Sequence, residues 1–101
     1  MNRAAFDKIN AAALPALPAL VARWLPGGRQ HGREYVALNP NRADRRPGSF
    51  RVNLRTGRWA DFATGDRGGD PISLAAFIFN ISQVEAARRL AAMLGLPESA
   101  S

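Results

Sequence analysis

Arginine is the residue type whose number and spacing in this sequence point to chemistry. The 101 residues include 14 basic and 8 acidic ones, and every basic residue except Lys8 is arginine. A guanidinium group presents a planar set of donors that suits phosphate oxygens and base edges, and it also stacks on rings. The formal net charge of +6 therefore makes nucleic acid a candidate partner, with a solvated, solubilising surface as the alternative.

The arginines gather in the middle of the chain, and a tryptophan lies among them. Arginines that follow a phosphate backbone, together with an exposed aromatic ring that stacks a base, are typical of single-strand binding surfaces. For Trp59 the alternative is an ordinary place in the hydrophobic core. The predicted nucleic-acid-binding residues are Arg42, Arg45, Arg46, Arg51, Arg55, Arg58, Trp59 and Arg67.

Residues suited to catalysis or metal binding are sparse. The chain has no cysteine, which excludes disulfides and thiolate zinc sites, and the single histidine, His31, lies in a polar stretch where we expect it to be exposed. Asp61, Asp66 and Asp70 are close in sequence and carboxylates suit Mg²⁺, but we expect Asp61 to pair with an arginine and Asp70 to cap a helix. We predict no catalytic residue, no metal and no cofactor. A small enzyme that uses this aspartate cluster, in which Asp66 alone has no expected structural role, is kept as an alternative hypothesis.

A β-hairpin is expected to position most of these arginines. Residues 49–54 alternate between apolar and polar side chains, which predicts a strand with one core-facing side. Residues 55–57 predict a three-residue loop with Gly57 in the left-handed conformation. Residues 58–62 then form the returning strand, and residues 34–38, which are rich in β-formers, form a third.

The three-residue loop determines which residues stand opposite each other. Phe50 then meets Phe62, so both rings face the core. On the other side of the hairpin, Arg51 meets Asp61 and forms an ion pair with it. Trp59 falls on this polar side, next to the arginines.

Helices are expected at both ends of the chain. Residues 3–13 favour a helix that Pro15 and Pro18 interrupt, and a second short helix follows. Near the C-terminus, good capping residues precede two further apolar stretches. We predict one α+β domain over residues 1–101, with a helical front (1–28), a small three-stranded antiparallel sheet (33–62), two C-terminal helices packed on the sheet (70–95) and a frayed tail (96–101).

The Ala/Leu-rich segment 11–25 is the most apolar part of the front. Pro15, Pro18 and Arg23 interrupt this segment, Pro26 follows it directly, and it is too short to span a bilayer. No signal peptide is evident either, so we expect a cytoplasmic protein with no membrane partner.

The order of the motifs resembles the N-terminal zinc-ribbon domain of bacterial and phage-type DNA primases. In that family a strand and a basic turn precede Cys-Pro-x-His, and Ser-Phe-x-Val-Asn, an aromatic residue, Cys-x-x-Cys and Gly-Gly-Asp-x-Ile-Ser follow. Here the zinc-ligand pairs fall near residues 40–43 and 61–65, where no ligand is present. The matching residues are 20–32, 35–38, Ser49, Phe50, Val52, Asn53, Gly57, Trp59, Gly68, Gly69, Asp70, Ile72, Ser73, Leu74, Glu85, Ala86, Ala87, Leu90 and Ala91.

The resemblance is to a metal-free version of this ribbon, as found at the front of primase-like or primase–helicase proteins of phages, plasmids and integrated elements. It implies a non-catalytic accessory domain that binds template or single-stranded DNA for a separate primase, polymerase or helicase domain or subunit. The alternative is a protein-interaction module that docks such a subunit through the Ala/Leu-rich front and has lost DNA binding. Without zinc the hairpin must be held by packing, for which Phe50, Phe62 and Phe77 are the expected material.

Overall fold

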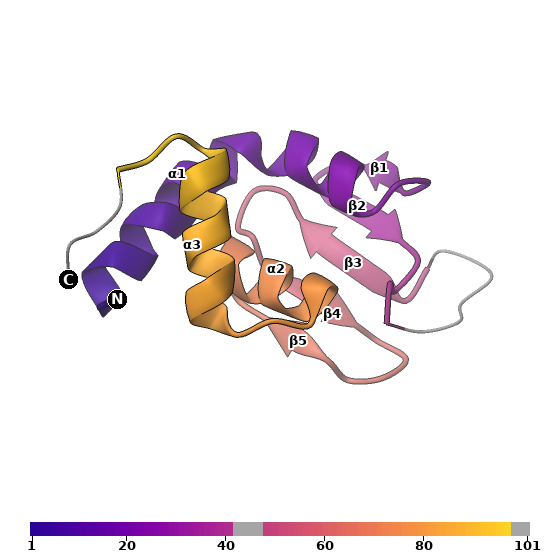
Figure 1. Cartoon of the computed structure of the whole chain (residues 1–101). Helices are drawn as coiled ribbons and strands as arrows, with labels where there is room; N and C mark the ends of the chain where they lie inside the picture. The colour runs from indigo at the N-terminus through magenta and orange to yellow at the C-terminus, as the bar shows by residue number, and fades with distance from the viewer. Residues whose placement is uncertain (42–47, 98–101) are drawn as a thin grey trace.

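The computed structural model describes residues 1–41 and 48–97, which form an antiparallel five-stranded sheet and three helices (Figure 1). The strands lie in chain order across the sheet, so the architecture is α+β, as predicted. The elements are α1 (Arg3–Trp24), β1 (Arg29–His31), β2 (Glu34–Ala37), β3 (Phe50–Asn53), β4 (Trp59–Asp61), β5 (Arg67–Gly68), α2 (Pro71–Phe79) and α3 (Gln83–Met93).

The two edge strands correct the prediction of a three-stranded sheet. β1 pairs with β2 across a tight turn in which Gly32 has a φ of +61°, and β5 pairs with β4. Both edge strands are short and carry polar or small residues, because an edge strand does not need an apolar side chain at every second position. Hydrophobic alternation, the signal that identified the inner strands, is therefore missing from them.

The register of the central hairpin differs by one residue from the prediction. Val52 stands opposite Trp59, and Phe50 stands opposite Asp61. The cause is the loop, which has four residues: the Asn53 side-chain oxygen accepts hydrogen bonds from the N–H groups of Arg55 and Thr56, at 2.9 and 3.1 Å. Gly57 has the expected left-handed φ of +80° and closes the turn by donating its N–H to the Asn53 carbonyl at 2.8 Å. A slip of one residue moves every side chain of a strand to the other face.

α1 is a single helix, which corrects the prediction of two helices broken at Pro15 and Pro18. Both prolines are exposed, and the apolar residues keep one continuous buried stripe past them. Packing of that stripe outweighs the two backbone hydrogen bonds that prolines cannot donate. The ribbon of α1 changes direction along its length, as expected of a helix with internal prolines (Figure 1). The buried stripe consists of Ile9, Ala13, Leu17, Leu20 and Val21.

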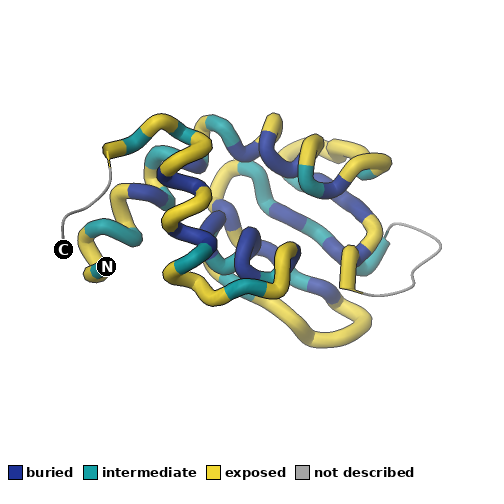
Figure 2. The backbone as a smooth tube through the Cα atoms, viewed as in Figure 1, coloured by how far each residue is buried: buried dark blue, intermediate teal, exposed yellow. Residues whose placement is uncertain are grey.

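The hydrophobic core lies between the sheet and the helices, and the buried positions of both face each other across it (Figure 2). α1 and α2 pack on one face of the sheet, and α3 packs against both helices. The prediction that both C-terminal helices pack on the sheet is therefore right for α2 and wrong for α3, whose apolar stripe is covered by α1 and α2. Three rings lie together under the hairpin: Phe77 of α2 is 5.8 Å from Phe50 and 4.7 Å from Trp59, between ring centroids. Across residues 1–41 and 48–97, no helix has both the length and the apolar character needed to cross a membrane.

The C-terminal helices begin where their capping residues predict. The carboxylate of Asp70 accepts the N–H of Ser73 at 2.8 Å, and Pro71 occupies the first turn of α2. Ser82 accepts the N–H of Glu85 at 3.1 Å at the start of α3. Residues 98–101, most of the predicted frayed tail, lie outside the part that the structure describes.

Candidate nucleic-acid interface

The face of the sheet that points away from α1 and α2 carries arginine. Arg51 of β3 and Arg67 of β5 are the direct partners of Ala60 on its two sides. Since directly opposed residues share a face, these three side chains form a row across β3, β4 and β5. Arg58 lies two residues before Ala60 and therefore extends from the same side.

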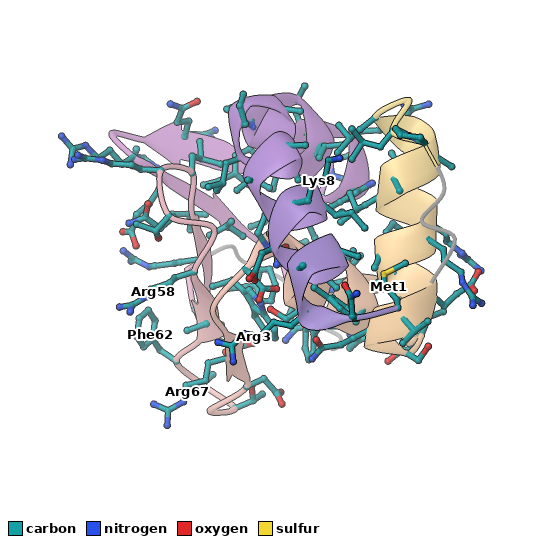
Figure 3. The ribbon with its side chains drawn as sticks, turned by 90° about the vertical axis from the view of Figure 1, so that its left-hand side faces the viewer. Met1, Arg3, Lys8, Arg58, Phe62 and Arg67 are labelled. Carbon is teal, nitrogen blue, oxygen red and sulfur yellow. The ribbon has the colours of Figure 1, made fainter. Side chains whose placement is uncertain are left out.

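Phe62 completes this group at the other end of β4. Its side chain is 73% exposed, and its N–H pairs with the Ser49 carbonyl at 2.9 Å, which continues the ladder beyond β4. Figure 3 shows Arg58, Phe62 and Arg67 projecting from the sheet on the side opposite α3. With Ala60 as its floor, the group lines a shallow concavity, which we call the open-face site: Arg51, Arg58, Ala60, Phe62 and Arg67.

Trp59 does not contribute an exposed ring to this site. It is 6% exposed, and its indole N–H donates to the Ser73 hydroxyl at 3.0 Å. The prediction of Trp59 as a base-stacking residue is therefore wrong, and the alternative of a core residue is right. The one-residue shift in register is the physical reason, because it exchanges the faces of Trp59 and Phe62. It also overturns the prediction that Phe62 lies in the core.

The predicted ion pair between Arg51 and Asp61 is also wrong. Arg51 instead pairs with Glu34 of β2 at 3.2 Å and donates its Nε–H to the Gly48 carbonyl at 3.0 Å. Both partners of the ion pair are partly exposed, so it contributes only about 0–1 kcal/mol. Glu34 also lines the concavity, so it offsets part of the positive charge of the open-face site.

Asp61 lies on the core side of the sheet and is 1% exposed. Burial raises the pKa of its carboxyl, but hydrogen bonds from the side chains of Asn39 and Ser49 and from the backbone N–H groups of Ala63 and Thr64 act the other way and leave the pKa below its ordinary value. Asp61 is thus a structural carboxylate that organises the turn after β4.

The remaining predicted residues lie at the hairpin tip or in the stretch of sequence after β2. Arg55 is exposed at the tip and does not line the open-face site. Arg42, Arg45 and Arg46 lie outside the described residues. His31 is exposed in β1, as expected.

Two aspartates of the sequence cluster have local structural roles. Asp70 caps α2, as expected, and the carboxylate of Asp66, for which no structural role was expected, accepts the Thr64 hydroxyl at 2.8 Å. In residues 1–41 and 48–97, no three metal-ligating side chains come together. These contacts do not test the hypothesis of an enzyme built on this aspartate cluster.

Phe62 is the site residue that sequence reasoning missed. The signal that points to it is Asn53, because an asparagine whose side chain accepts two following N–H groups favours a longer loop. A four-residue loop places Phe62 on the open face and Trp59 in the core.

No protein-family model and no curated protein matches this chain.

Proposed function

We propose that this chain is a non-catalytic domain that binds template or single-stranded DNA through the open-face site. The observation that carries the proposal is the pair Arg58 and Arg67, both exposed, which flank the exposed ring of Phe62 on the face of the sheet that the three helices leave open (Figure 3). Neither arginine forms an ion pair with any residue in 1–41 or 48–97. Uncompensated guanidinium groups around a ring suit a ligand that alternates anionic and aromatic groups.

The resemblance to primase zinc ribbons supports the same function. We infer a metal-free ribbon from a primase-like replication protein of a phage, plasmid or integrated element, working beside a separate primase, polymerase or helicase domain. The ring cluster of Phe50, Trp59 and Phe77 would take over the stabilising role of zinc, because it holds the hairpin to α2.

The competing hypothesis, docking of a protein through the Ala/Leu-rich front, receives less support. The large apolar side chains of α1 are buried in the domain's own core, so the exposed side of this segment carries only small alanines, two prolines and Arg23. Arg58 and Arg67 of the open face, in contrast, form no ion pair with any described residue.

A salt titration tests the proposed function. Fluorescence anisotropy of a labelled (dT)12 oligonucleotide, measured from about 20 to 300 mM salt, should show binding that weakens with a log–log slope of roughly 0.7 per phosphate contact. Replacing Arg58 and Arg67 together by glutamine should reduce the slope by about 1.4. Arg88→Gln, an exposed arginine of α3, is the matched control and should leave the slope unchanged. An absence of binding at the lowest salt would refute the proposal.

A further inference from the structure

Ala60 makes the open-face site concave. Its direct neighbours across the strands are Arg51 and Arg67, about 5 Å away, and its neighbours on the same face of the chain are Arg58 and Phe62, about 7 Å away. All four side chains are long or bulky, whereas Ala60 ends at Cβ. The result is a hollow above Ala60 whose lining includes the three arginines, Phe62 and Glu34.

The ring of Phe62 packs against little else among residues 1–41 and 48–97. Among the large apolar residues of 1–41 and 48–97 it is the most exposed, at 73% against 47% for Met93 and 44% for Phe79. No ring contact forms between Phe62 and any other described aromatic residue, whereas Phe50, Trp59 and Phe77 all contact one another. An exposed ring beside two arginines that form no ion pair is the combination of groups that single-strand-binding surfaces use.

We propose that this hollow accepts one unpaired nucleobase, which stacks on Phe62 above Ala60 while the phosphates on either side contact Arg58 and Arg67. This inference rests on the proposed function and adds a defined single-nucleotide subsite to it. A base within a duplex is stacked on both faces and has no free face for the ring. The site therefore selects single strands, and it does so without reading the base, because every base offers a π-face.

The charges decide between a nucleotide and the other possible occupants. An apolar side chain from a partner protein would cover Phe62 but would leave Arg58 and Arg67 without counter-charge. A second copy of this domain would bring the same cations into contact, which repel each other. A nucleotide supplies both the ring and the adjacent anions.

The test separates stacking from electrostatics by means of the ligand. (dT)12 is compared with a 12-mer of abasic tetrahydrofuran units that has the same phosphates and no bases, using anisotropy at fixed salt. Wild type should bind (dT)12 about 5- to 150-fold more tightly than the abasic strand, the range observed for removal of one base–aromatic stack. Phe62→Ala should lose this preference and keep its affinity for the abasic strand. Phe62→Trp should retain the preference, and its indole fluorescence should be quenched by (dT)12.

The outcomes are distinguishable from a failure of the proposed function. Binding of both strands with equal affinity by wild type, or an unchanged preference in Phe62→Ala, overturns the base subsite while DNA binding by the arginines stands. No binding of either strand refutes both. Because Phe62 is exposed, Phe62→Ala should melt within a few degrees of wild type by circular dichroism. A dimer that dissociates in Phe62→Ala, seen by light scattering, would show that a second copy is the occupant and would overturn the inference.

Discussion

The side-chain amide of Asn39 donates a hydrogen bond of 2.6 Å to the Asp61 carboxylate, and both residues are only 1% exposed. Asn39 follows β2 and Asp61 ends β4, so this bond joins two strands that are not neighbours in the sheet. The same carboxylate accepts the N–H of Ala63 at 2.8 Å, at the start of the turn towards β5. Asp61, the residue before Phe62 of the open-face site, is therefore anchored to the buried side chain of Asn39.

The lowered pKa of Asp61 predicts how stability depends on pH. A carboxyl whose folded pKa lies below its unfolded value of 3.8 contributes stability that is fully present above that value. The contribution is lost as the pH falls through the folded pKa, because the proton then binds the folded state too. Urea unfolding between pH 2.5 and 7 should show stability that is level at neutral pH and declines below about pH 4.

Asp61→Asn should remove the part of the loss of stability below about pH 4 that protonation of Asp61 causes. The amide leaves at least one of the donors that Asp61 accepts without a partner, so the variant should be less stable at pH 7 by about 1–3 kcal/mol. Asp66→Asn, at an exposed position, is the matched control and should follow the wild-type curve. If Asp61→Asn and wild type lose stability in parallel below pH 4, the inference about the Asp61 pKa is wrong.

Gly68 is required for the close contact between β5 and Trp59. A Cβ atom at Gly68 would overlap the Trp59 indole and the Ser73 hydroxyl, whereas one at Gly69 would meet no atom within 4 Å. Gly68→Ala should therefore destabilise the fold by about 1–3 kcal/mol, and Gly69→Ala should stay within about 0.5 kcal/mol of wild type. Urea unfolding of the two variants provides the comparison. Equal stabilities would mean that Trp59 moves aside without cost.

The parts of the fold that depend on local chemistry were predictable from the sequence. α2 begins after Asp70 because a carboxylate and a following proline satisfy the orphan groups of the first turn. The central strands follow from alternation. The hairpin register was not predictable from alternation, because it depends on how many residues the Asn53 side chain draws into the loop.

The candidate site was also predictable only in part from the sequence. The positions of Arg58 and Arg67 near turns predict that they are exposed, and they are. Trp59 and Phe62 exchange places because two aromatic residues three positions apart fit the hairpin in either register equally well by hydrophobicity alone. The four-residue loop at Asn53 selects between the two registers, and the bond from Trp59 to Ser73 of α2 stabilises the one observed.

The prolines of α1 show that packing overrides a local signal, and they lead to a prediction. Proline in a helix interior is about 3 kcal/mol less favourable than alanine. The Pro15 ring is exposed, so Pro15→Ala loses few contacts and restores a backbone donor. Allowing for the more flexible unfolded chain, we expect a gain of about 1–2 kcal/mol in unfolding free energy. Ala19→Ser, an exposed change on the same helix, is the control for composition. A destabilised Pro15→Ala variant would mean that the bend is needed for α1 to contact both the sheet and α3.

Removing the charge of Glu34 should strengthen DNA binding at the open-face site. Its carboxylate pairs with Arg51 at 3.2 Å and is an acidic group in the lining of the concavity. Glu34→Gln removes that charge and releases the Arg51 guanidinium for a phosphate, and a single exposed charge at contact distance is worth about 1 kcal/mol. Affinity for (dT)12 should rise by about two- to fivefold at low salt, and the gain should fade as salt screens it. Glu85→Gln breaks the similar exposed pair with Arg89 on α3 and should leave affinity unchanged. A Glu34→Gln variant that binds no more tightly than Glu85→Gln at the lowest salt would place the phosphate path away from Arg51.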